Sequence, residues 1–253
     1  MPRLAEPVPV LVHGFLGFAT FGPISYFRGV QKTLRGIGIT PIIPALPKAG
    51  SIAERADVLA RILTQHPASS FVLIGHSLGG LDGRQVIARL DPDHRIKVLV
   101  TVATPHRGTI VANRLLESKG LLAGVAHRYW QEALHDLDPA TRQRETIPDR
   151  SDVKYISYAG SRMTQELPSW LRYVAGPIEE DSDGLVPSAS AQWGDFRGCL
   201  RADHLEFVGW SLALPGRKAA RPFEHLPFWR RIVVDAIANA SQTGEEHEPD
   251  PTR

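Results

Sequence analysis

Three side chains in this sequence have the types that nucleophilic catalysis by a serine requires. The first is Ser77, which stands in Gly75-His76-Ser77-Leu78-Gly79-Gly80 directly after the apolar run 71–74. Glycines around a serine, between a buried strand and a helix over residues 81–90, are typical of a nucleophile elbow. We predict that Ser77 is a nucleophile; the alternative is a glycine-rich turn with a hydrogen-bonding serine.

The other two side chains are a candidate base and a candidate acid. A serine hydroxyl needs a histidine base at neutral pH, and that base needs an acid to orient it. Behind such an elbow, the acid follows the serine along the chain and the histidine comes last. His204 fits best among the ten histidines because it lies in a late loop after a strand. Asp183 is the best acid because Gly184 and an apolar run follow it, with Asp181 in reserve.

A fourth group of residues follows the first predicted strand, at residues 8–12. The glycines of His13-Gly14-Phe15-Leu16-Gly17 would bring backbone N–H groups to the carboxyl edge of a sheet. We predict an oxyanion hole made by the N–H groups of Phe15 and Leu78. We expect the His13 ring to hold the loop and prefer this role to a catalytic one. The candidate substrate-binding residues are His13, Gly14, Leu16 and His76.

Strands that alternate with helices must position these residues. Periodicity and breakers predict further strands at 37–43, 97–102, 153–158 and near Cys199, and helices at 21–34, 52–66 and 223–239. Residues 160–181 are predicted to be a loop. Alternation of this kind predicts an α/β fold with a mostly parallel sheet flanked by helices.

The stretch from residue 109 to about 150 interrupts this alternation. It has a helical pattern without a strand, and it follows a strand that ends near the expected site. We interpret it as a helical lid over an apolar pocket, the alternative being a pair of packing helices. We expect one domain over residues 1–243, with this insertion at about 109–150, and a disordered tail at 244–253.

Composition excludes several other classes of function. The chain has 253 residues, a formal net charge of +2 and scattered basic residues, so we expect no nucleic-acid partner. Its single cysteine, Cys199, forms no internal disulfide, and no spacing of metal-ligand residues is present. Neither a leader nor a transmembrane segment is visible. We therefore expect a cytoplasmic protein, or one exported without a Sec signal, that acts on a small-molecule or lipid ester and contacts a lipid interface transiently.

The motifs together resemble those of the bacterial true lipases, the triacylglycerol lipases of the Pseudomonas, Burkholderia and Proteus type. The matching pieces occur in that family's order over roughly residues 8 to 210: His13-Gly14-Phe15, the Ser77 elbow, Thr104-Pro105-His106-Arg107-Gly108, residues 134–144 and 153–160, Asp183-Gly184-Leu185-Val186, and His204-Leu205-Glu206. The resemblance implies an α/β-hydrolase fold with Ser77, Asp183 and His204 as its catalytic triad. It also implies Phe15 and Leu78 as oxyanion donors.

The sequence departs from this family at its structural calcium site. The family commonly uses an aspartate two residues after the catalytic histidine and another about twenty residues before the catalytic acid. Here Glu206 stands at the first position, and residues 163–166 contain no aspartate. We therefore expect no calcium and no other cofactor. The leader and disulfide of secreted members are also missing, which favours the shorter leaderless lipases and esterases as kin.

The sequence therefore predicts a serine carboxylic-ester hydrolase, most simply a lipase that cleaves acylglycerol esters through an acyl-enzyme. The alternatives within this chemistry are a carboxylesterase for short or medium acyl chains and a phospholipase. A second pair of alternatives is an acyltransferase, which uses the same acyl-enzyme, and a non-catalytic α/β-hydrolase scaffold.

Overall fold

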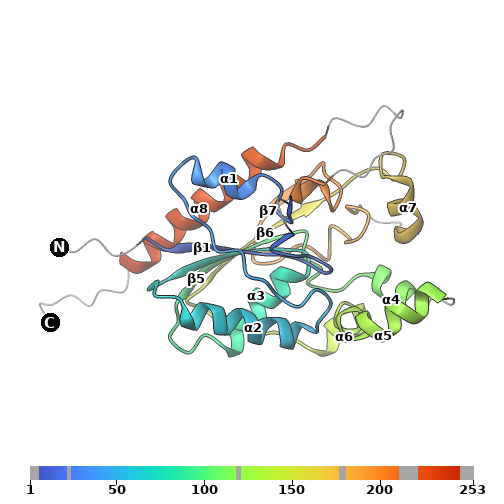
Figure 1. Ribbon diagram of the computed structural model, residues 1–253, viewed down its shortest axis with the longest axis horizontal. Coiled ribbons are helices and arrows are strands. Elements are labelled where there is room, and N and C mark those ends of the chain that lie inside the picture. Colours follow the sequence, from blue (N-terminus) through green and yellow to red (C-terminus); the bar gives the residue numbers. More distant parts are fainter. Residues whose placement is uncertain (1–5, 22–23, 118–120, 177–180, 211–221, 246–253) are drawn as a thin grey trace, which may run out of the picture.

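A parallel β-sheet forms the centre of the molecule (Figure 1). The computed structural model describes residues 6–21, 24–117, 121–176, 181–210 and 222–245. Within these residues five strands lie in the order β1-β4-β5-β6-β7, and every neighbouring pair is parallel. The predicted mostly parallel α/β architecture is confirmed. The strands are β1 (Val8–Val12), β4 (Phe71–His76), β5 (Ile96–Val102), β6 (Lys154–Gly160) and β7 (Asp195–Leu200).

Helices cover both faces of this sheet (Figure 1). Successive side chains of a strand point to opposite faces. Along β4, Val72 and Ile74 accordingly join the apolar core under α1 and α8, whereas Phe71 and Leu73 join the core under α2 and α3. A strand buried on both faces is apolar over most of its length, which explains the run 71–74 in the sequence. The helices are α1 (Val30–Arg35), α8 (His225–Glu245), α2 (Ile52–Gln65) and α3 (Leu78–Arg89).

The predicted helix over residues 21–34 is wrong in its first half. The chain forms a short antiparallel hairpin of β2 (Thr20–Phe21) and β3 (Ile24–Ser25) before α1 begins. Gly29 precedes α1 with φ 75°. This left-handed conformation suits glycine and interrupts helical geometry, so the helix starts only after it.

The predicted strand over residues 37–43 is also wrong. Only Ile42 pairs with the sheet, through a hydrogen bond from its N–H to the Pro9 carbonyl and one from Leu11 N–H to its own carbonyl. Pro41 and Pro44 flank Ile42 and have no N–H to donate. A ladder cannot continue past residues that lack this donor.

The insertion after β5 is helical, as predicted. It contains α4 (Ile110–Glu117), α5 (Leu121–Asp136) and α6 (Pro139–Arg144). All three helices lie beyond one end of the sheet (Figure 1). The predicted loop at 160–181 is wrong in part because it contains α7 (Ser169–Ala175). A short 3-10 helix, η1 (Glu206–Val208), follows β7.

The last helix is longer than the sequence suggests. α8 continues beyond Asn239 to Glu245, so it includes the first residues of the tail predicted at 244–253. Residues 246–253 of that tail lie outside the described residues. No described helix combines the length and the hydropathy that a membrane-spanning segment needs.

Candidate active site

Ser77 occupies a strained turn between β4 and α3. Its φ of 56° and ψ of −131° lie in a region that residues with a side chain rarely adopt. Hydrogen bonds hold this backbone in place: Ser77 N–H donates to the Val102 carbonyl at 2.9 Å, and Thr104 Oγ1 donates to the Ser77 carbonyl at 2.8 Å. The surrounding structure therefore fixes the conformation that a nucleophile elbow requires.

The glycines of the elbow are required by close packing. A Cβ on Gly75 would lie 2.5 Å from the backbone nitrogen of Gly80, and one on Gly79 would overlap the Val12 carbonyl. Side chains at these positions would push α3 away from β1 and β4. The G-x-S-x-G spacing is thus explained by the approach of helix and strands.

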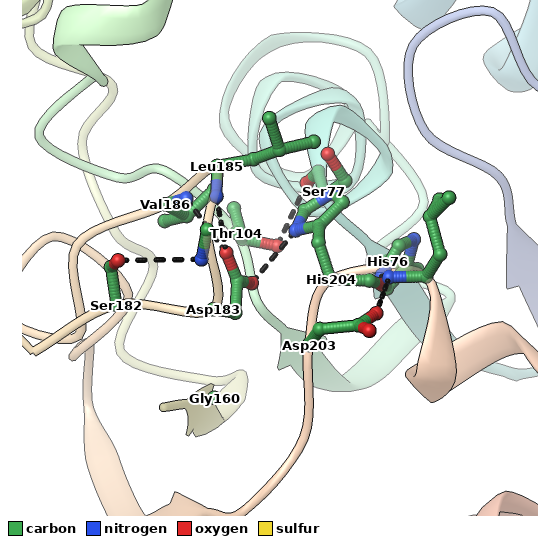
Figure 2. Close-up of polar contacts among 12 residues, drawn as sticks. His76, Ser77, Thr104, Gly160, Ser182, Asp183, Leu185, Val186, Asp203 and His204 are labelled. Carbon is green, nitrogen blue, oxygen red and sulfur yellow. Dashed lines mark hydrogen bonds and ion pairs between the residues drawn. The ribbon is translucent and has the colours of Figure 1, made fainter. Parts of the chain in front are cut away.

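Asp183 and His204 form a buried pair (Figure 2). His204 Nδ1 lies 2.7 Å from Asp183 Oδ2, and His204 N–H donates to the Asp183 carbonyl at 3.0 Å. A carboxylate only accepts, so Nδ1 carries a proton, and in the neutral ring Nε2 is the nitrogen with the lone pair. The structure thus brings together the acid and base that the sequence singles out, with the free nitrogen suited to accept a proton.

The turn after Asp183 holds its carboxylate in place. Leu185 and Val186 donate their N–H groups to Asp183 Oδ1 at 2.9 Å and 2.7 Å (Figure 2). These bonds leave Oδ2 for the imidazole. Asp181, the reserve candidate, is exposed, and its backbone carbonyl accepts from Ser188 N–H. Asp183 is therefore the carboxylate that orients His204.

The loop of residues 201–206, which carries His204 and is called the base loop below, also contacts the elbow. His76, the residue before Ser77, lies with its Nε2 3.1 Å from the His204 carbonyl. In the described part of the chain, no hydrogen bond joins the Ser77 hydroxyl to the His204 ring. Proton transfer between them requires the hydroxyl to come into hydrogen-bonding range, a tightening common to catalytic pairs when substrate binds.

The predicted oxyanion donors flank Ser77. Leu78 is the first residue of α3, where a backbone N–H has no partner within the helix. On the other side, a Cβ on Gly14 would lie 2.7 Å from Ser77 Cβ, so the peptide that leads to Phe15 runs beside the serine. Among the described residues neither the Phe15 nor the Leu78 N–H finds an acceptor. Both donors remain available to an oxyanion.

Two of the predicted substrate-binding residues lie in the protein interior, away from the surface of the site. His13 and His76 are fully buried, and both ring nitrogens of each are engaged in the protein. They therefore support the site and do not line it, which corrects that part of the prediction. Gly14 packs on Ser77, while Leu16 is 43% exposed with φ 53° and can meet a substrate.

The His13 ring holds the loop of residues 13–17, which we call the oxyanion loop. Nδ1 lies 3.0 Å from the Gly14 carbonyl, and Leu46 N–H donates to Nε2 at 3.3 Å. Nδ1 must carry the proton and Nε2 must accept, so the ring has to be neutral. Burial favours that form and lowers the pKa of His13 from 6.5 to about 4.

A second buried histidine links the oxyanion loop to the base loop. Gly14 N–H donates to the Tyr26 hydroxyl at 3.2 Å, and that hydroxyl lies 2.8 Å from His76 Nδ1. Because the His204 carbonyl only accepts, His76 Nε2 donates to it and Nδ1 accepts from Tyr26. Burial lowers the pKa of His76 well below 6.5, which keeps this ring neutral. Gly14, Tyr26, His76 and His204 thus form one relay of hydrogen bonds.

A buried arginine supports the same oxyanion loop. The Arg55 guanidinium of α2 donates to the His13 carbonyl at 2.6 Å and to Asp82 Oδ2 at 2.7 Å. Both side chains of this ion pair are fully buried. Sequence reasoning missed Arg55, although a signal exists, since it shares a helical face with Ile52 and Leu59. The sequence offers no comparable signal for Tyr26, because its pattern predicts a helix over residues 21–34.

An apolar cluster lies next to the oxyanion donors. Phe15 meets Trp130 of α5 edge to face, with 5.8 Å between ring centroids. Residues from α3, α4 and α5 complete the cluster around Leu78. The insertion contributes Ala112, Ala133, Leu134 and Leu137 to this cluster, with Leu115 and Leu116 packed against it, and α2 and α3 contribute Ile52, Leu78 and Leu81.

Comparison of the sequence with known proteins identifies a family and several relatives. A family model described as the PGAP1-like alpha/beta domain matches residues 55–193. Triacylglycerol lipase 2 of Saccharomyces cerevisiae is 33% identical over 210 aligned residues, which cover 74% of this chain but only 63% of the yeast protein. The triacylglycerol lipase of Vibrio cholerae is 32% identical over 254 aligned residues, which cover 81% of this chain and 80% of that protein.

Solved structures lead to the same fold. The mature form of Bacillus licheniformis lipase BlEst2 superposes with a TM-score of 0.67 at 20% identity, covering 82% of this chain and 89% of that one. The fold, the elbow around Ser77 and the sequence relatives all indicate an α/β-hydrolase of the lipase kind. The chain therefore carries a PGAP1-like alpha/beta domain and belongs to an α/β-hydrolase lipase family.

Proposed function

We propose that this chain hydrolyses carboxylic esters of acylglycerols through an acyl-enzyme on Ser77. The observation that carries the proposal is the buried His204–Asp183 pair, 2.7 Å apart, beside a serine held at φ 56°. A strained backbone and a buried polar pair both cost folding free energy, and both are features that a serine nucleophile with a histidine base requires.

The chemistry follows from the protons assigned above. His204 Nε2 takes the proton of the Ser77 hydroxyl as Oγ attacks the ester carbonyl carbon. The carbonyl oxygen gains negative charge, and the N–H groups of Phe15 and Leu78 stabilise it, each donor contributing about 3 to 4 kcal/mol in comparable sites. His204 then protonates the departing alcohol. A water molecule, with His204 as its base, then attacks the carbonyl carbon of the acyl-enzyme, which releases the carboxylic acid and restores the Ser77 hydroxyl. Throughout, Asp183 stays ionised and orients the ring.

An acylglycerol is the favoured substrate class. The yeast and Vibrio relatives are named triacylglycerol lipases, and the apolar cluster around Leu78 and Trp130 suits an acyl chain. The ordered motifs from His13 to Glu206 support a narrower place among lipases of the Pseudomonas, Burkholderia and Proteus type. We include transient contact with a lipid interface in the proposal, because exposed Leu16 lies in the oxyanion loop.

Replacing the nucleophile tests the reaction. Ser77→Ala should abolish p-nitrophenyl ester turnover and leave the far-UV circular dichroism spectrum unchanged, since alanine removes only the hydroxyl. Asp183→Asn should lower kcat strongly because the amide no longer fixes the required tautomer. Ester turnover by Ser77→Ala at the wild-type rate would place the nucleophile elsewhere.

Substrate series separate the alternatives. Rates on p-nitrophenyl esters from acetate to dodecanoate distinguish a lipase, which favours long chains, from a short-chain carboxylesterase. A rise in rate above the solubility limit of the substrate would support an interface-responsive lid. Release of fatty acid from phosphatidylcholine would indicate a phospholipase. Formation of new esters with an added alcohol would indicate an acyltransferase.

A further inference from the structure

Arg162 lies between the two loops that carry the candidate acid and base. We call residues 181–187 the acid loop and residues 201–206 the base loop; Figure 2 shows Ser182 beside Asp183 on the first and Asp203 beside His204 on the second. Arg162 follows the end of β6 and donates its backbone N–H to the Ser182 carbonyl at 2.9 Å. Its side chain reaches the other loop.

The Arg162 guanidinium forms a bidentate ion pair with Glu206. Nη2 lies 2.8 Å from Oε2 and 3.1 Å from Oε1, and Nε lies 3.0 Å from Oε2. Only 3% of the arginine side chain and 10% of the glutamate side chain are exposed. A planar fork against a carboxylate, sheltered from water, fixes both partners in one geometry.

The remaining acceptor capacity of Glu206 is also used. Asp203 N–H donates to Oε2 at 2.8 Å and Phe223 N–H to Oε1 at 3.3 Å. Asp203 is the residue before His204, so the position of the Glu206 carboxylate determines where the base loop runs. One residue, Arg162, therefore connects to the acid loop through its backbone and to the base loop through its side chain.

These residues do not fit the calcium site of the resembling family. Calcium takes six to eight oxygen ligands. Here a guanidinium and two backbone N–H groups already engage Glu206. Glu166, at the other expected position, pairs with Arg201. Across the described residues, no three histidine, cysteine, aspartate or glutamate side chains gather as a metal site. A cation beside Glu206 would also meet the positive charge of Arg162.

We propose that Arg162 acts as a positioning residue that holds the base loop against the acid loop without a metal ion. The proposal rests on the proposed function, because it assigns to Arg162 the alignment of His204 with Asp183. Loss of the guanidinium leaves Glu206 as a buried charge without its counterion. The base loop must then shift to hydrate it, and the His204 ring moves with that loop.

Variants of Arg162 test the proposal on the full chain. In Arg162→Gln, kcat for a p-nitrophenyl ester should fall at least about tenfold while KM stays within about twofold, since misplacement of a catalytic group affects the reaction step. Arg162→Lys should recover part of kcat because it restores the charge but not the fork. The matched control is Arg197→Gln, whose ion pair with Asp195 is about half exposed, and it should leave kcat unchanged.

A chelation arm tests the absence of a metal requirement independently. Wild-type protein incubated with EDTA should keep its kcat, and added CaCl2 should not raise it. Inactivation by EDTA that CaCl2 reverses would overturn the proposal, as would a wild-type kcat in folded Arg162→Gln. If that variant does not fold, Glu206→Gln replaces it, with the same expected kcat loss and the same overturning result.

Fluorophosphonate labelling separates this inference from the proposed function. A wild-type protein that neither reacts at Ser77 nor turns over esters would contradict the proposed function itself. A reactive, active wild type whose Arg162→Gln variant is equally fast would contradict only the role of Arg162.

Discussion

At the scale of single residues, the site depends on buried polar groups whose protons are fixed by their partners. His13 and His76 are both neutral, and each accepts at one ring nitrogen and donates at the other. Protonation of either ring would remove an acceptor from a buried donor. The proposed catalytic residues are therefore supported by two buried histidines that must stay neutral.

The relay through Tyr26 yields a prediction at this scale. Tyr26→Phe removes the hydroxyl between Gly14 N–H and His76 Nδ1 and leaves two buried groups without a partner. We expect a loss of about 1 to 3 kcal/mol in the free energy of unfolding, measured by urea titration. kcat should fall as well, because the relay joins the oxyanion loop to the base loop.

Tyr158→Phe is the control for Tyr26→Phe. Tyr158 is also buried, but the described structure shows no hydrogen bond from its hydroxyl. Its replacement should leave kcat unchanged. Equal effects of the two substitutions on kcat would contradict a specific role for the relay.

At the scale of elements, helix α2 supports the oxyanion loop. Its N-terminus is closed by a capping box between Ser51 and Glu54, and Arg55 reaches from its first turn to the carbonyls of Pro47 and His13. Asp82 of α3 balances the charge, although its Oδ1 has no hydrogen-bond partner among the described residues. Two helices and a loop therefore meet at one guanidinium.

Substitutions of this ion pair separate stability from catalysis. Arg55→Met should cost about 3 to 5 kcal/mol in unfolding free energy because it leaves Asp82 buried and unpaired. Arg55→Met combined with Asp82→Leu should recover much of that stability, since two apolar side chains replace the pair. kcat should stay low in the double variant because the His13 carbonyl still lacks its donor. Recovery of both quantities would show that Arg55 does not position the loop.

The elements differ in how well the sequence predicts them. Strands buried on both faces, such as β1 and β4, are visible because each contains a continuous apolar run. The hairpin of β2 and β3 and helix α7 are short, and tertiary contacts decide their form. Residues 37–43 have the composition of a strand, yet the prolines on either side of Ile42 and Ile43 limit the pairing to one bridge at Ile42. Local pattern therefore predicts the centre of the sheet better than its surroundings.

At the scale of the whole molecule, the parallel sheet brings distant segments to one edge. Phe15 follows β1, Ser77 follows β4, Asp183 follows α7 and His204 follows β7. Their types and order in the sequence predict that they lie at this edge, where the structure pairs His204 with Asp183 next to the elbow of Ser77. Tyr26, Arg55 and Arg162 were not predictable in the same way, because their roles depend on which distant backbone groups lie within reach. The sequence thus shows the reacting groups more readily than the groups that position them.

Buried titratable groups also make the stability of the whole molecule depend on pH. The folded-state pKa of His13 is about 4, below its ordinary 6.5, so its contribution is present above pH 6.5 and is lost as pH falls through about 4. Burial raises the pKa of Asp82 and of Asp203 from 3.8 to about 6. Their contributions have the opposite sign: present below pH 3.8 and lost as pH rises through about 6.

Comparison with a variant isolates the histidine contribution. His13→Asn keeps a polar side chain that does not titrate. The wild type should be the more stable protein at pH 7, and its advantage should shrink as pH falls from 6.5 toward 4. Urea unfolding of both proteins across this range measures the difference. A difference that stays constant with pH would mean that His13 is not held neutral by the fold.

Mass spectrometry after reaction with a fluorophosphonate shows whether Ser77 is the nucleophile of an ester hydrolase. We expect one covalent adduct per chain, located on the peptide that contains Ser77, with loss of esterase activity in proportion to labelling. Ser77→Ala should give no adduct under the same conditions. An adduct on another serine, or full activity after complete modification of Ser77, would contradict the claim.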